Sequence, residues 1–133
     1  MSKLTFAFDR PYDEVEIHGE AYRLYYDDES LEKYQRLANK YQVEAQKFLK
    51  RQEDIPNMSN EEVEKLQDDG MKFIGDFVEG FYGSGSYTKL YEQSGKAMIN
   101  FMPLVEFTLE WLQGKVPSVE REKRNYYVGN KKK

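Results

Sequence analysis

The sequence contains no cysteine and only one histidine among its 133 residues. Without cysteine the chain has no disulfide framework, no thiolate zinc site and no cysteine nucleophile. His18 has no serine or second histidine close to it in sequence, and acid–base catalysis needs an oriented partner, so we interpret it as structural. The acidic clusters lack the alternating Asp/Asn spacing of a calcium loop. We therefore predict a protein that is not an enzyme, with no catalytic residue, no cofactor and no metal site.

A long hydrophobic run is also missing. The most apolar stretch, residues 97–112, is shorter than the roughly 20 residues that cross a bilayer, and it includes Glu106 and Glu110. Residues 1–8 alternate in polarity and lack the apolar core of a signal peptide. The sequence therefore predicts a cytoplasmic protein with no membrane partner.

What the chain does have is aromatic side chains and charge. Aromatic residues make up 15% and charged residues 33% of the sequence, and this aromatic content argues against disorder. The net charge is −4, but residues 120–133 carry +4, which leaves residues 1–119 at −8. We predict a single globular, α-rich domain over residues 1–119 and a basic C-terminal tail over residues 120–133.

Hydrophobic spacing in the first third predicts strands. Leu4, Phe6 and Phe8 alternate with smaller or polar residues, as in a short strand that ends before Pro11. A second alternation stops at His18-Gly19 and resumes, which predicts a β-hairpin because Gly19 accepts a positive φ. An isolated hairpin is marginally stable, so it must pack on the rest of the chain. The expected N-terminal unit is a hairpin, extended to three short strands if residues 4–8 join it.

Three main helices should follow this unit. Capping residues at 27–30 precede the first helix, which should end before Ile55-Pro56. Ser59 and Glu62 form a capping box for the second helix, which Gly83 should terminate. The third segment runs from Tyr87 to about residue 113 and should end at Gly114 and Pro117. We expect Ser94-Gly95 and Pro103 to interrupt it, with a kink or break at Pro103. The predicted fold class is α+β, mostly α.

The third segment carries more apolar surface than one core contact requires. One stripe consists of Leu90, Tyr91, Met98, Phe101, Met102, Val105, Leu109 and Leu112. Leu104, Phe107 and Trp111 lie beside it and widen the apolar arc to roughly 220°. Either the other elements wrap this helix, or these three residues contact another chain, since Trp and Phe are favoured interface anchors. In the second case, polar residues at Phe107 and Trp111 should abolish the contact with the other chain.

Three stretches of the sequence resemble one protein family. They are residues 8–22 (FDRPYDEVEIHGEAY), 28–34 (DESLEKY) and 80–91 (GFYGSGSYTKLY), the last ahead of an apolar C-terminal helix. The chain thereby resembles the small tail assembly chaperones of siphophages and prophages of Gram-positive bacteria. The resemblance implies a non-enzymatic, oligomeric protein of virion morphogenesis. It would coat and solubilise the tape measure protein, self-associate, give way to the major tail (tube) protein, and be absent from the mature virion.

The basic tail suggests two further hypotheses. The family commonly makes a longer product by programmed frameshifting, and Lys131, Lys132 and Lys133 are compatible with a slippery adenine run. The same lysines, with Arg121, Lys123, Arg124 and two adjacent tyrosines, combine positive charge with stacking surface, as single-stranded nucleic acids favour. A small phage-encoded nucleic-acid-binding protein is therefore the alternative function, which the acidic body disfavours.

Overall fold

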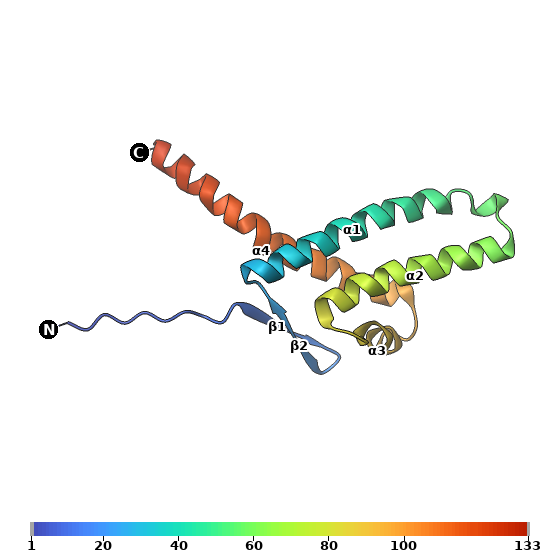
Figure 1. Ribbon diagram of the computed structural model, residues 1–133, viewed down its shortest axis with the longest axis horizontal. Helices are drawn as coiled ribbons and strands as arrows, with labels where there is room; N and C mark the ends of the chain where they lie inside the picture. Colours follow the sequence, from blue (N-terminus) through green and yellow to red (C-terminus); the bar gives the residue numbers. More distant parts are fainter. Residues whose placement is uncertain (1, 133) are drawn as a thin grey trace.

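The computed structural model describes the backbone of residues 2–132 and the side chains of residues 2–116. The fold is α+β and mostly helical, as the sequence predicts (Figure 1). In chain order its elements are β1 (Tyr12–Ile17), β2 (Glu20–Tyr25), α1 (Asp28–Gln52), a 3-10 turn η1 (Ile55–Asn57), α2 (Asn60–Tyr82), α3 (Ser86–Gln93) and α4 (Met98–Lys132).

β1 and β2 form the predicted antiparallel hairpin, with Val15 opposite Tyr22. The two residues of its turn, His18 and Gly19, both have positive φ (52° and 81°), as the favoured two-residue hairpin turn requires. Leu24 on the inner face is fully buried. The hairpin is therefore anchored to the helices by one face, which supplies the packing that two strands alone lack.

α1 and α2 are antiparallel neighbours joined through η1 (Figure 1). Asp27 caps α1 by accepting a hydrogen bond from the Ser30 amide at 3.2 Å. Ser59 and Glu62 form the predicted capping box of α2. Each interaction satisfies amide groups that the first helical turn leaves without a partner.

The glycines of α2 admit side chains from α1. A Cβ atom at Gly80 would lie 2.4 Å from Leu37 Cδ1, and one at Gly70 would lie 2.6 Å from Phe48 Cε2. Glycine costs about 1 kcal/mol relative to alanine within a helix. Here glycine allows the two helices to approach closely, because any larger residue at these positions would displace the α1 side chains.

α4 completes the core by packing against the other helices and the hairpin. Its buried residues Phe101, Val105 and Leu112 meet an aromatic cluster in which Tyr34 of α1 stacks on Phe81 of α2 at 4.3 Å between ring centroids. The one buried polar side chain of α4 among residues 98–116 is that of Thr108. Its hydroxyl lies 2.6 Å from the Tyr82 hydroxyl and donates to the Leu104 carbonyl oxygen at 2.8 Å.

The predicted strand over residues 4–8 is wrong. Residues 2–10 form an irregular extended arm that leaves the body on the side opposite the α1–α2 turn (Figure 1). Leu4, Phe6 and Phe8 are 94%, 80% and 89% exposed. Alternating polarity identified a segment suited to a strand, but strand formation also needs a hydrogen-bonding neighbour, which the arm lacks within the described residues.

The predicted interruption at Ser94-Gly95 is confirmed, whereas the predicted break at Pro103 is not found. The third segment is interrupted at residues 94–97, where Gly95 and Lys96 have φ values of 83° and 55°. α4 then continues through Pro103 and past residue 113 to Lys132, across the predicted tail boundary at residue 120. Pro103 stands near the beginning of α4. Proline has no backbone N–H to hydrogen-bond to the Ile99 carbonyl, and at this position the missing hydrogen bond disturbs only the first turns of the helix. The chain therefore has four helices where three were expected.

Candidate partner-binding surfaces

Trp111 holds the hairpin against α4. Its indole Nε1 donates to Asp13 Oδ2 at 2.8 Å, and its ring meets Tyr34 edge-on at 6.0 Å between centroids. Lys115 Nζ also lies 3.0 Å from Asp13 Oδ2. The indole hydrogen bond, aided by Lys115, lowers the pKa of the Asp13 carboxyl against the opposing effect of its partial burial. Trp111 thus already has a partner within its own chain.

Phe107 is the exposed member of the predicted trio. Its side chain is 47% exposed, whereas Leu104 and Trp111 are partly buried against the core. Ile99, at 84% exposed, and Pro103 are also at the surface and precede Phe107 at intervals of four residues. Residues four apart share one side of a helix. The outer side of α4 therefore carries a short apolar ridge of Ile99, Pro103 and Phe107.

The basic residues proposed for nucleic-acid contact lie outside the described side chains. They are Arg121, Lys123, Arg124, Lys131, Lys132 and Lys133, in the part of α4 for which only the backbone is described.

An open apolar groove of about 640 Å³ lies between the outer halves of α1 and α2 and the beginning of α4. Its walls combine three methionines with aromatic and aliphatic side chains, and none of the described lining residues is charged. The lining residues are Tyr41, Ala45, Phe48, Leu49, Gln52, Gln67, Gly70, Met71, Phe73, Ile74, Tyr91, Met98 and Met102. Methionine is unbranched and polarizable, so it adapts to apolar partners of varied shape. The groove therefore suits an apolar segment better than a reacting polar substrate.

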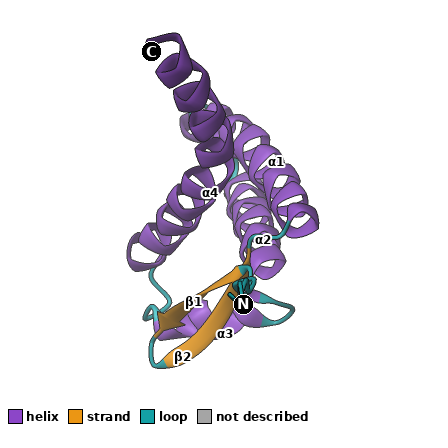
Figure 2. Ribbon diagram, turned by 90° about the vertical axis from the view of Figure 1, so that its left-hand side faces the viewer, coloured by secondary structure: helices purple, strands orange, loops and turns teal. Residues whose placement is uncertain are grey.

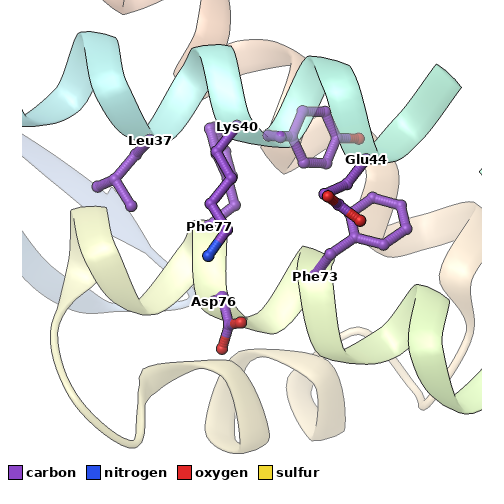
Figure 3. Close-up of a pocket in the computed structure, with 7 residues that line it drawn as sticks. Leu37, Lys40, Glu44, Phe73, Asp76 and Phe77 are labelled. Atoms are coloured by element: carbon purple, nitrogen blue, oxygen red, sulfur yellow. The ribbon is translucent and has the colours of Figure 1, made fainter. Parts of the chain in front are cut away.

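A second hollow, on the α1–α2 seam, is too small for a ligand. It measures about 40 Å³, against the several hundred Å³ of ordinary ligand pockets. Figure 3 shows the aromatic side chains of Phe73 and Phe77 and the charged side chains of Lys40, Glu44 and Asp76 among those that line it. We interpret it as a packing gap between two helices.

The described residues offer no metal cluster, since no group of three or more His, Asp or Glu side chains converges among them. Among the same residues, no helix is long and apolar enough to cross a bilayer. Burial of the Tyr82 phenol raises its pKa to about 12. This phenol is enclosed in the core and therefore has a structural role.

The groove is the feature that the sequence reasoning missed. Met98 and Met102 were assigned to the core stripe of the third segment, and both are only partly buried. Met71 belongs to a different helix, more than twenty residues earlier. Only the tertiary arrangement of α1, α2 and α4 brings these three methionines together. Their concentration, three of the five in the chain, was the available signal.

Comparison of the chain with protein-family models, curated proteins and solved structures found no match.

Proposed function

We propose that this protein is a non-enzymatic chaperone that binds an apolar helical face of a client in the groove bearing Met71, Met98 and Met102. The observation that carries the proposal is the uncharged, methionine-rich lining of this open groove. Amphipathic helices are commonly bound in this way, with their apolar positions laid into a hydrophobic groove.

The client we propose is the tape measure protein of a siphophage or prophage, with the major tail (tube) protein as the later partner. This choice depends on the resemblance of residues 8–22, 28–34 and 80–91 to tail assembly chaperones. The charge distribution is compatible with it, because a net charge of −8 over residues 1–119 keeps client-bearing particles apart in the host cytoplasm.

Co-expression with the neighbouring tape measure protein tests the proposal. The unmodified chain should keep the tape measure protein in the soluble fraction. Met98→Lys should reduce the recovered client at least tenfold, because the ammonium group would have to be desolvated beneath the bound helix. Solubility and light scattering of the co-purified particle are the measurements.

Ile99→Lys is the matched control. Ile99 adjoins Met98 in the same helical turn but is 84% exposed and does not line the groove. This variant should capture the client like the unmodified chain. Equal loss in both variants, or an insoluble client with the unmodified chain, would contradict the groove assignment. Circular dichroism on both variants excludes unfolding as the cause.

A further inference from the structure

The molecule has two unpartnered features that fit each other, and the first is the arm of residues 2–10. Leu4, Phe6 and Phe8 are all at least 80% exposed. They alternate with Thr5 and Ala7, so in an extended backbone they share one side. The Phe6 and Phe8 rings contact one another at 4.8 Å between centroids, but this pair packs on nothing else among the described residues. Such a stretch has the side-chain pattern of a β-strand but no neighbouring strand to pair with among the described residues.

The second feature is the free edge of β1. Ile17 and Glu20 flank the two-residue turn, so they form a hydrogen-bonded pair, and the pairing alternates along the strand. Glu14 and Glu16 consequently direct their backbone groups away from β2. No other described residue forms a hydrogen bond with these groups. A short open edge of this kind is a template for one more strand.

The surface beside that edge belongs to α4 and includes the exposed ring of Phe107. β1 lies on the α4 side of the hairpin (Figure 2), with Asp13 bonded to Trp111 and Ile17 lining a hollow together with Leu104. At 100° per residue, Phe107 lies roughly 60° round the helix from Leu104 and roughly 40° from Trp111, on the solvent side of both. A strand added to β1 would therefore extend the sheet across Phe107, and its inward side chains would cover that ring.

We propose that the arm of a second copy of this chain adds to the outer edge of β1, with Leu4, Phe6 and Phe8 turned inward over Phe107. Strand addition of this type combines main-chain hydrogen bonds with pockets for alternate side chains. The outward side of the arm then places Lys3 beside the exposed carboxylates of Glu14 and Glu16. Opposite charges on neighbouring strands stabilise the pairing, so the acidic edge favours this arm over an arbitrary strand.

A second copy is favoured over the chain's own arm by the residues that link the arm to β1. A tight reversal needs residues with positive φ, but the first glycine of the chain is Gly19 and the link contains Arg10-Pro11. Proline fixes φ near −65° and holds the preceding residue in extended conformations. Pro11 also remains paired with β2, because its carbonyl accepts from the Tyr26 amide at 2.7 Å. The arm accordingly points away from its own sheet.

Cross-linking tests the proposal directly, since the chain has no native cysteine. A chain with Thr5→Cys and a longer, tagged chain with Glu14→Cys are co-purified and treated with a short bismaleimide. We expect a product that joins the two chains. The Gln52→Cys chain, whose thiol lies at the groove in place of the β1 edge, should give none with Thr5→Cys. Three results would overturn the proposal. They are a cross-linked product with Gln52→Cys, a cross-link that forms only within one chain of a Thr5→Cys/Glu14→Cys double variant, and the absence of any cross-linked product.

Sedimentation supplies the second measurement. Deletion of residues 2–9 should convert the associated chain to a monomer, with unchanged helix content because these residues are exposed in the structure. Phe107→Gln should weaken association at least tenfold, whereas Val43→Gln, at a position that is 50% exposed on α1, should not. A monomeric parent chain, or association that survives both the deletion and Phe107→Gln, would overturn the proposal. Client solubilisation by the arm-deleted chain separates this result from the groove assignment.

Discussion

At the scale of single residues, Tyr82 and Thr108 make the polar contact that fixes α4 against α2. The Tyr82 side chain is 8% exposed and that of Thr108 is fully buried, so their hydroxyl groups are shielded from water and hydrogen-bond to each other. Thr108 also donates to the Leu104 carbonyl oxygen within its own helix. A hydroxyl can donate only one hydrogen, so Tyr82 must be the donor in the contact with Thr108. The neutral form of the phenol is therefore built into the core.

This arrangement predicts a loss of stability in alkali. The folded pKa of Tyr82, about 12, lies above the ordinary value of 10. The contribution of this group to the free energy of unfolding is therefore complete below pH 10 and is lost as the pH rises to about 12. The loss should be on the order of 2 kcal/mol. Urea unfolding of the wild type and of Tyr82→Phe between pH 8 and pH 12 measures it.

The Tyr82→Phe variant isolates this group from the other buried tyrosines. At pH 8 it should be about 1 kcal/mol less stable than the wild type, the usual value of one hydrogen bond. Above pH 10 the difference should shrink and then reverse, because only the wild-type unfolded state gains an ionised phenol at this position. A difference that stays constant across this pH range would refute the assigned pKa shift.

Trp111 shows what hydrophobic spacing in the sequence can and cannot predict about a single residue. The pattern correctly placed this residue beside the core stripe of α4, together with Leu104 and Phe107. It carried no information about the neighbour, because Asp13 is 98 residues away in the sequence. Only Phe107 remains substantially exposed. Of the two substitutions suggested by the sequence, the one at Phe107 tests an interface cleanly, whereas the one at Trp111 also detaches the hairpin.

At the scale of elements, the α1–α2 pair depends on small residues in α2. Leu37 packs against the backbone of Gly80 so closely that a methyl group there would meet three of its carbon atoms within 3.2 Å. One of these is the branch atom Cγ, so the whole side chain has to move. Gly114, in α4, has open space within 4 Å of the position a Cβ would occupy. The two glycines therefore form a natural contrast.

Gly80→Ala and Gly114→Ala should change stability in opposite directions. Alanine gains about 1 kcal/mol of helix propensity at either site. At Gly80 this gain is outweighed by overpacking, which typically costs about 1–3 kcal/mol, so a net loss of about 1 kcal/mol is expected. At Gly114 the gain should be realised in part or in full. The urea unfolding midpoints of the two variants measure these changes. A Gly80→Ala chain that is more stable than the wild type would show that the α1 side chains move aside without loss of stability.

The element boundaries were predictable where a local chemical signal marks them. Asp27, the Ser59 capping box and Gly83 set the limits of α1 and α2 close to the expected positions. The sequence offered two interruptions of the third segment, at Ser94-Gly95 and at Pro103, and only the first divides it into two helices. Pro103 is tolerated because α4 begins only five residues earlier. Local preference alone did not rank these sites.

At the scale of the whole molecule, the two proposed surfaces lie at different ends. The groove is lined by the outer halves of α1 and α2, whereas the arm and the β1 edge lie on the opposite side of the body (Figure 1). Client capture and self-association are therefore geometrically compatible in one particle. This separation follows from tertiary arrangement, which no sequence pattern in the chain encoded.

Charge at this scale distinguishes the proposed chaperone function from the nucleic-acid-binding alternative. Residues 1–119 carry −8 and residues 120–133 carry +4, so a polyanion meets attraction only at the C-terminal end. About six phosphate contacts give single-strand binding a salt exponent near −4. Raising the salt concentration from 50 to 200 mM should then weaken binding by roughly 300-fold. We expect negligible retention of single-stranded DNA at physiological salt.

Deletion of residues 120–133 therefore should leave the main activity intact. The shortened chain keeps the groove, the arm and the β1 edge, so it should solubilise the client and sediment like the full chain. Filter binding of single-stranded DNA at 50 and 200 mM salt, performed on both chains, runs in parallel. Two results together would favour the nucleic-acid-binding function. The full chain alone would retain DNA tightly at 200 mM salt, and the deletion would abolish client capture, because binding would then depend on residues 120–133 and not on the groove.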